Sequence, residues 1–135
     1  MNADSPRIIS LPKISDPRGN LTFVEGNNHI PFLIHRTYWI YDVPGGEMRG
    51  SHAYRTNQEL IIAVSGSFDV VIDDGANRVT HSLNRSYFGL YIPARQWREL
   101  VNFSTNSLCL VLASREYNET DYIRDFNEYK KLKAE

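Results

Sequence analysis

The stretch RGSHAYR, residues 49–55, places a histidine and a tyrosine two positions apart. In a β-strand, residues i and i+2 point to the same face, so His52 and Tyr54 are predicted to lie side by side. An imidazole that titrates near neutral pH can accept and release a proton, and a phenol can donate a hydrogen bond or a proton. The pair predicts a proton-transfer site, and the alternative for Tyr54 is a packing aromatic.

Glycine, proline and polar residues recur at fixed distances around this pair. One set is Gly46, His52, Glu59 and Gly66, spaced G-x5-H-x-Y-x4-E-x6-G, and the other is Gly89, Pro93, Arg98 and Asn102, spaced G-x3-P-x4-R-x3-N. These spacings resemble the two signature motifs of the cupin family of β-barrels. The resemblance implies a barrel in which the side chains of both motifs converge.

The polar residues of this chain depart from the usual cupin metal site. Cupins commonly carry histidines where Tyr54 and Arg98 stand. A site of histidines and carboxylates for a divalent metal needs several converging donors. His52 and Glu59 remain, but a neutral tyrosine is a poor ligand and the permanent charge of Arg98 repels a cation. We therefore expect no metal and no other cofactor.

Longer segments narrow the resemblance. They are DPRGNLTFVE at 16–25, the run from 30 to 55, SGSFDVVIDDG at 65–75, GLYIPARQWREL at 89–100 and NETDYIRDF at 118–126. Together they are similar to the dTDP-4-keto-6-deoxyglucose 3,4-ketoisomerases, the WxcM-like or FdtA-like cupins that act without a metal. These enzymes typically read RGxHAH where this chain has RGSHAY, and often WHE where it has WRE.

The resemblance implies a sugar isomerase that moves a carbonyl from C4 to C3 through an enediol or enediolate. Such enzymes serve deoxyaminosugar synthesis for O-antigen, lipopolysaccharide or other surface polysaccharides. The reaction needs a base for the C3 proton, an acid at C4 and stabilisation of the oxyanion. His52 is the predicted base, and Tyr54 is the predicted acid or hydrogen-bond donor. The family also has an active-site tyrosine where Tyr38 stands.

The same resemblance implies the residues that bind the substrate, a dTDP-linked keto-sugar. Arg18 and Arg49 stand where the family's arginines contact the sugar or the diphosphate, for which guanidinium forks are suited. Glu59 is expected to orient His52 or to bind a sugar hydroxyl, unless it faces solvent. Arg98 is expected to contact phosphate or the oxyanion. The family further implies a homodimer, with N-terminal strands exchanged between subunits.

Other functions remain open at this point. The replaced histidines fit a cupin with weakened catalysis that binds a dTDP-sugar or a partner protein. A related nucleotide-sugar epimerase would use a similar base and acid at other carbons. A metal-dependent cupin dioxygenase is disfavoured by Tyr54 and Arg98.

Short strands must position these residues. Runs rich in β-branched and aromatic residues, bounded by turn signals, predict strands at 33–43, 59–66, 67–74, 87–93 and 107–114. Alternation places Phe68, Val70 and Ile72 on one face of the third run. In the first run it places Tyr38, Ile40 and Asp42 on one face and Trp39 and Tyr41 on the other. Many short strands favour an all-β cupin barrel, a double-stranded β-helix or jelly roll.

The C-terminal segment has a different pattern. Apolar residues at i+3 and i+4 spacing, after a cap at Thr120 or Asp121, predict one amphipathic helix over about 120–132. We expect a single cupin domain over residues 1–135.

The totals exclude several classes of partner. A formal net charge of −1 over 135 residues gives no electrostatic reason for nucleic acid or an anionic membrane. No apolar run approaches the ~18 residues of a membrane span, and the N-terminal residues do not resemble a signal peptide. We therefore expect a cytoplasmic protein. Cys109 is expected in the core, and His29, His35 and His81 match neither motif.

Overall fold

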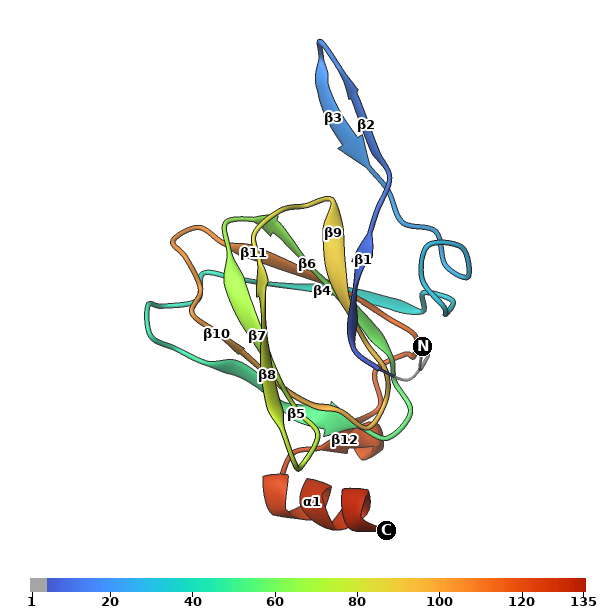
Figure 1. The fold of residues 1–135 in the computed structure, drawn as a ribbon, viewed down its shortest axis with the longest axis vertical. Coiled ribbons are helices and arrows are strands. Elements are labelled where there is room, and N and C mark those ends of the chain that lie inside the picture. The colour runs from blue at the N-terminus through green and yellow to red at the C-terminus, as the bar shows by residue number, and fades with distance from the viewer. Residues whose placement is uncertain (1–4) are drawn as a thin grey trace.

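The computed structural model describes residues 5–135. These residues form a barrel of short strands with one α-helix near the C-terminus (Figure 1). The strands are β1 (Arg7–Ser10), β2 (Lys13–Asp16), β3 (Gly19–Thr22), β4 (Arg36–Tyr41), β5 (Arg49–Tyr54), β6 (Glu59–Ser65), β7 (Phe68–Asp73), β8 (Arg78–Leu83), β9 (Phe88–Ile92), β10 (Trp97–Val101), β11 (Leu108–Ala113) and β12 (Tyr122–Ile123). The helical segments are a 3-10 turn at Glu119–Asp121 and α1 at Phe126–Ala134.

Two antiparallel sheets form the walls of the barrel. Their strand orders are β1-β9-β6-β11-β4 and β12-β5-β10-β7-β8. The main core lies between them and includes Ile61 and Val111 from the first sheet and Val70 and Leu100 from the second, all of them fully buried. The predicted all-β cupin jelly roll with a C-terminal helix is confirmed.

Alternation along the strands decides which side chains face the interior. On β7, Phe68, Val70 and Ile72 are buried in the core, as the spacing predicts. On β4, Tyr38 and Ile40 pack against the same core. Trp39 and Tyr41 are 57% and 58% exposed on the other face.

The strand β4 ends at Tyr41, one residue before Asp42, the last residue predicted for its inner face. Asp42 was expected beside Tyr38 and Ile40, but it lies beyond the strand in left-handed backbone with φ 57°. The chain turns there, so the period of two does not extend to Asp42.

The predicted helix over about 120–132 is wrong in its first part. The carboxylate of Asp121 accepts hydrogen bonds from the backbone N–H groups of Thr56 and Asn57, at 2.9 and 3.0 Å, and so caps no helix. The next residues form β12, which pairs with β5. The helix α1 begins only after Asp125, whose carboxylate accepts from the Asn127 N–H at 2.8 Å. Contacts with β5 thus override the local helical period.

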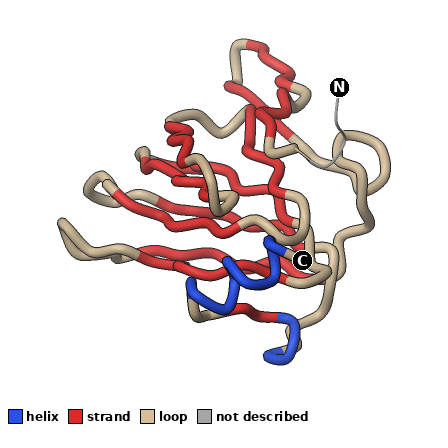
Figure 2. Tube along the Cα trace, turned by 60° about the horizontal axis from the view of Figure 1, so that its bottom comes forward, coloured by secondary structure: helices blue, strands red, loops and turns tan. Residues whose placement is uncertain are grey.

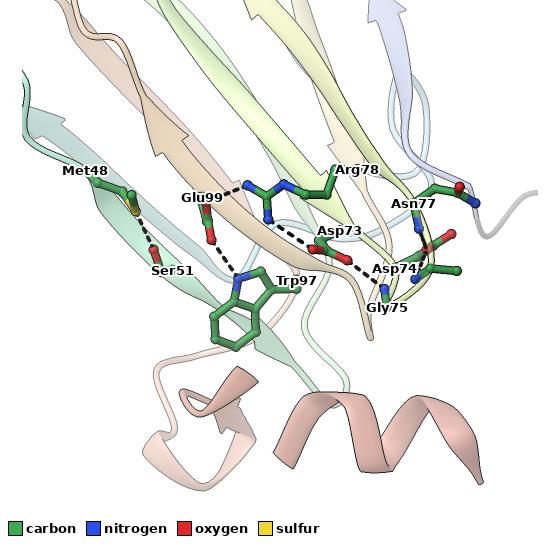
Figure 3. A network of polar contacts seen from close by, with 10 residues as sticks. Met48, Ser51, Asp73, Asp74, Gly75, Asn77, Arg78, Trp97 and Glu99 are labelled. Atoms are coloured by element: carbon green, nitrogen blue, oxygen red, sulfur yellow. Dashed lines mark hydrogen bonds and ion pairs between the residues drawn. The ribbon is translucent and has the colours of Figure 1, made fainter. Parts of the chain in front are cut away.

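A polar network on β7, β8 and β10 holds the sheet beside α1 (Figure 3). Arg78 bridges Asp73 at 3.0 Å and Glu99 at 3.1 Å. Glu99 also accepts a hydrogen bond from the Trp97 indole at 3.3 Å. Trp97 in turn packs on the ring of Phe126 in α1. The network therefore holds the start of β10, where Arg98 follows Trp97.

The hairpin of β2 and β3 stands away from the barrel (Figures 1 and 2). These strands pair with each other as a separate two-stranded sheet. Ile14 and Leu21 are each 55% exposed on it. Among residues 5–135, no helix is long and apolar enough to cross a membrane.

Candidate active site

One cavity gathers most of the predicted site residues. Its volume is about 540 Å³, and β4, β5, β10 and the segment around β12 supply its walls. The lining residues are Arg36, Tyr38, Trp39, Ile40, Met48, Arg49, Gly50, His52, Tyr54, Arg98, Tyr117, Tyr122 and Arg124. A second groove, of about 950 Å³, shares Tyr117 with this cavity. The motif residues His52, Tyr54, Glu59 and Arg98 do not line that groove. The smaller cavity is therefore the candidate active site.

His52 and Tyr54 lie side by side, as their spacing predicts. Their ring centroids are 4.9 Å apart, and the two residues are 8% and 5% exposed. Nε2 of His52 and the hydroxyl of Tyr54 are buried and have no hydrogen-bond partner within residues 5–135. Buried polar atoms are nearly always paired in folded proteins. These two atoms are therefore available to a ligand in the cavity.

The surroundings of His52 keep its imidazole neutral. Burial has the largest effect, followed by the positive charges of Arg98, Arg124 and Arg36, and together they lower the pKa of His52 to about 2. Burial and nearby cations both disfavour the imidazolium. A neutral imidazole is the form that can accept a proton.

A buried ion pair forms the floor of the cavity. Arg98 and Glu59 are each 1% exposed, and Arg98 donates from Nε and Nη2 to Oε1 of Glu59 at 3.1 and 2.9 Å. The hydroxyl of Tyr38 donates to Oε2 of Glu59 at 2.5 Å and accepts from Nη2 of Arg98 at 3.0 Å. Burial, and then the charge of Glu59, raise the pKa of Tyr38. The three side chains hold one another in place.

This arrangement bears on the roles predicted for Glu59 and Arg98. A solvent-facing Glu59 is wrong, because the carboxylate is buried under Arg98 and Tyr38. Within the described chain, no hydrogen bond joins Glu59 to His52. All three guanidinium nitrogens of Arg98 donate to protein oxygens, and its charge is paired with that of Glu59. Among residues 5–135, no cluster of three or more histidine, cysteine or acidic side chains is placed to hold a metal.

A β-bulge beside His52 makes room for Arg98. Arg98 lies opposite His52 and Leu100 lies opposite Arg49, so Gly50 and Ser51 share a single partner on β10. Gly50 has φ +67°, and its carbonyl accepts from Nη1 of Arg98 at 2.8 Å. A Cβ at this position would lie 2.2 Å from that nitrogen. The glycine of RGSHAYR is therefore required by Arg98.

Replacing Gly50 with alanine is expected to lower the free energy of unfolding by about 2–3 kcal/mol, through backbone strain and displacement of Arg98. Urea denaturation followed by circular dichroism measures it. Gly46→Ala is the matched control: φ there is +83°, but nothing lies within 4 Å of its Cβ. It should cost about 1 kcal/mol, for the backbone alone. Equal losses in the two variants would contradict the contact with Arg98.

Four arginines and tyrosines that line the cavity were not predicted as site residues: Arg36, Tyr117, Tyr122 and Arg124. The ring of Tyr122 packs against both members of the pair, with its centroid 5.0 Å from that of His52 and 4.7 Å from that of Tyr54. Arg36 is two residues from Tyr38 on β4, so strand alternation could have identified it. Tyr122 and Arg124 belong to NETDYIRDF, which was assigned to a helix instead.

The two predicted substrate-binding arginines lie in different places. Arg49 lines the cavity. Arg18 lies in the turn of the β2–β3 hairpin, where its side chain is 90% exposed and pairs with Asp16 at 2.7 Å. One chain alone therefore does not bring Arg18 to the cavity.

Three comparisons place the chain among known proteins. A model of the family described as FdtA, WxcM-like, C-terminal, matches residues 4–134. A TDP-4-oxo-6-deoxy-alpha-D-glucose-3,4-oxoisomerase from Aneurinibacillus thermoaerophilus is 40% identical over 128 residues, which are 95% of this chain and 92% of that protein.

Solved structures agree with these matches. A 3,4-ketoisomerase from Helicobacter canadensis has a TM-score of 0.94 and 39% identity, covering 96% of this chain and 98% of that one. QdtA, a sugar 3,4-ketoisomerase from Thermoanaerobacterium thermosaccharolyticum solved in complex with TDP, has a TM-score of 0.94 and 35% identity, covering 96% and 94%.

Proposed function

Since the chain belongs to the FdtA, WxcM-like family, whose relatives above are sugar 3,4-ketoisomerases, we propose that it isomerises TDP-4-keto-6-deoxyglucose to a TDP-3-keto-6-deoxyhexose. The observation that supports this most directly is the pair of unpartnered buried atoms, Nε2 of His52 and the hydroxyl of Tyr54, in one cavity. A neutral base beside a hydroxyl donor is what a proton transfer between neighbouring carbons requires.

The reaction needs no oxidant, because one carbon is oxidised as its neighbour is reduced. His52 takes the proton from C3, and the electrons of that bond form the C3–C4 double bond and place negative charge on the C4 oxygen. The proton of the C3 hydroxyl passes to the C4 oxygen, and a proton delivered to C4 by the imidazolium of His52 then leaves a ketone at C3, a hydroxyl at C4 and a neutral His52. The hydroxyl of Tyr54 donates a hydrogen bond to the oxyanion. Burial, and then the charge of Glu59, raise the pKa of Tyr54, so its proton stays in place.

The two tyrosines are not equivalent in this mechanism. The hydroxyl proton of Tyr38 is directed at Glu59, away from the substrate, whereas the hydroxyl of Tyr54 has no partner in the described chain. We therefore assign Tyr54 as the donor and Tyr38, with Glu59 and Arg98, as positioning residues.

Tyr54→Phe is expected to lower kcat about a hundredfold, because it removes the donor to the oxyanion. Tyr38→Phe should lower kcat only about tenfold, since it acts through the position of Glu59 and Arg98. Steady-state kinetics with TDP-4-keto-6-deoxyglucose measure both. A larger loss of kcat in Tyr38→Phe than in Tyr54→Phe would reverse the assignment.

Incubation with TDP-4-keto-6-deoxyglucose in deuterated water tests the function itself. The proposed isomerase yields a 3-keto sugar that carries ring deuterium. Deuterium in a sugar that keeps its carbonyl at C4 would indicate an epimerase. Unchanged substrate together with tight TDP binding would indicate a binding protein and exclude the proposed reaction.

We also propose that the active protein is a homodimer, with the β2–β3 hairpin of one subunit reaching the cavity of the other. The hairpin leaves the barrel and carries Arg18, which its own cavity lacks. An apolar face of the first sheet supports a second copy as partner. It consists of Trp39, Tyr41, Val64, Leu108 and Leu110. Exposed apolar patches of this kind mark association surfaces. The cytoplasmic location and the role in surface polysaccharide synthesis stay predictions.

A heterodimer of an Arg18→Ala subunit and a His52→Asn subunit tests the exchange. Its two chains are co-expressed with different tags and purified through both. One of its sites would combine an intact His52 with the partner's Arg18, so about half of the wild-type activity is expected. Each parent homodimer should be impaired. A heterodimer no more active than its parents would show that Arg18 does not act across the interface.

A further inference from the structure

The imidazole of His52 is held by aromatic rings and not by hydrogen bonds. Its Nε2 has no partner, and no hydrogen bond to its other ring nitrogen is found within residues 5–135. A catalytic base is normally oriented by a third group that bonds to its far nitrogen. Here the contacts are the rings of Tyr54 and Tyr122, at centroid distances of 4.9 and 5.0 Å and interplanar angles of 79° and 60°. The orientation of this base therefore depends on packing.

The two rings do not restrain His52 equally. Tyr54 follows His52 on the same strand, β5, so the two move together. Tyr122 comes from β12, which reaches β5 from the C-terminal part of the chain and places Tyr122 opposite Tyr54 in the register. Tyr122 is therefore the restraint that is independent of the strand carrying the base.

The residue before Tyr122 anchors this segment. β12 has only two residues, fewer than the usual strand, so contacts outside its own pairing must help to hold it. The carboxylate of Asp121 accepts from the N–H and the hydroxyl of Thr56, at 2.9 and 2.8 Å, and from the N–H of Asn57 at 3.0 Å. Its carbonyl accepts from the N–H of Arg55 at 2.9 Å. Asp121 thus ties the start of β12 to the turn that follows β5.

The ring of Tyr122 is also covered from its own segment. The guanidinium carbon of Arg124 lies 4.2 Å from the ring centre. Arg124 is held in turn by Glu119, to which its Nε and Nη2 donate at 2.6 and 2.9 Å. The Tyr117 hydroxyl donates to the same carboxylate at 2.6 Å, and the Tyr117 ring contacts that of Tyr122. These contacts leave the Tyr122 ring little freedom to turn away from His52.

We propose that Tyr122 is a positioning residue of the isomerase, and that its ring, anchored through Asp121, fixes the orientation of the His52 imidazole toward the substrate. The inference rests on the proposed function, because it takes His52 to be the base. Displacement of a reacting group by about 1 Å can cost about a hundredfold in rate, so an unrestrained imidazole is a poor base even in the right cavity. The role belongs to the ring of Tyr122 and does not need its hydroxyl.

Steady-state kinetics with TDP-4-keto-6-deoxyglucose tests the role of the ring. Tyr122→Leu should lower kcat by about 10–100-fold and change KM by less than about twofold, since the base is misplaced and the substrate still binds. Tyr122→Phe keeps the ring and should retain kcat to within about threefold. Wild-type kcat in Tyr122→Leu, or a change confined to KM, would overturn the proposal. A loss in Tyr122→Phe as large as in Tyr122→Leu would assign the role to the hydroxyl instead.

Tyr129→Leu is the control for general loosening of the C-terminal segment. Tyr129 is fully buried in a cluster with Ala53, Trp97 and Ile123, beside β12, but it does not line the cavity. Its replacement should lower the unfolding temperature at least as much as Tyr122→Leu does, and leave kcat unchanged where both variants are folded. An equal loss of kcat in the two variants would show that loosening, and not the ring contact, is the cause.

A double-mutant cycle tests the anchor. Asp121→Asn retains one acceptor oxygen but cannot accept from both Thr56 and Asn57, so it should lower kcat about fivefold through the position of Tyr122. In the Tyr122→Leu background the same substitution should have almost no further effect on kcat. Losses that multiply in the double variant would show that Asp121 does not act through Tyr122.

NMR relaxation of the His52 ring carbons tests the orientation without turnover. The order parameter should be high in the wild-type protein and in Tyr122→Phe, and fall below about 0.6, the flexible range, in Tyr122→Leu. His81, on β8 and outside the cavity, is the internal reference. An order parameter of His52 that is the same in all three proteins would overturn the proposal.

The two proposals can therefore fail separately. Loss of His52 order in Tyr122→Leu, together with a wild-type protein that forms no 3-keto sugar, would uphold the contact and reject the isomerase. Formation of the 3-keto sugar by Tyr122→Leu at wild-type kcat would uphold the isomerase and reject Tyr122 as a positioning residue.

Discussion

His52→Asn is expected to lower kcat for isomerisation by about 10³–10⁴-fold while TDP still binds. Asparagine retains a polar side chain of similar reach but cannot accept the C3 proton. Because His52 is proposed to act on the sugar ring and not on the nucleotide, affinity for TDP should change little. Stopped assays of the 3-keto product measure kcat, and calorimetry with TDP measures binding.

His81→Asn provides the control for this variant. His81 lies on β8, away from the cavity, and its replacement should leave kcat unchanged. Deuterium exchange at C3 separates the steps further, since His52→Asn should abolish exchange as well as product formation. Full activity in His52→Asn would show that another group is the base.

Arg98→Met is expected to lower the free energy of unfolding by about 3–5 kcal/mol. The substitution leaves the carboxylate of Glu59, 1% exposed, buried without its cation. It also removes the hydrogen bonds that Arg98 donates to Tyr38 and to the Gly50 carbonyl. Urea denaturation measures the loss, and Arg98→Met should also lower kcat, because the floor of the cavity is no longer held.

Two further variants identify the cause. Arg98→Met combined with Glu59→Gln removes both charges, so it should recover much of the lost stability. Arg55→Met breaks an exposed pair with Glu128, whose side chain is 54% exposed, and should cost under about 1 kcal/mol. An Arg98→Met protein as stable as Arg55→Met would show that the buried pair contributes no net stability.

Local patterns sufficed for one wall of the site and for five of the strands, β4, β6, β7, β9 and β11. The period of two placed Phe68, Val70 and Ile72 in the core and Tyr38 toward the cavity. It also placed His52 beside Tyr54 on β5. Such patterns are reliable because a pleated strand with one buried face leaves each side chain only two directions.

The same reasoning failed where long-range contacts outweighed local preference. The i+3 and i+4 spacing after Thr120 is a sound helix signal, yet Tyr122 and Ile123 pair with β5, and Ile123 is fully buried there. Burial of a large apolar side chain and completion of a sheet edge are worth more than a few residues of helix propensity. The helix therefore starts at Phe126.

By itself, the sequence determined the class of fold, the family resemblance and the adjacency of His52 and Tyr54, the predicted proton-transfer pair. Only the tertiary structure decided the partners of that pair. Closure of the barrel brings Arg98 onto Glu59 across 39 residues of sequence and places Arg36 and Arg124 in the same cavity. The charge state of His52 depends on these distant arginines, because electrostatic effects follow distance in space and burial, neither of which a spacing motif records.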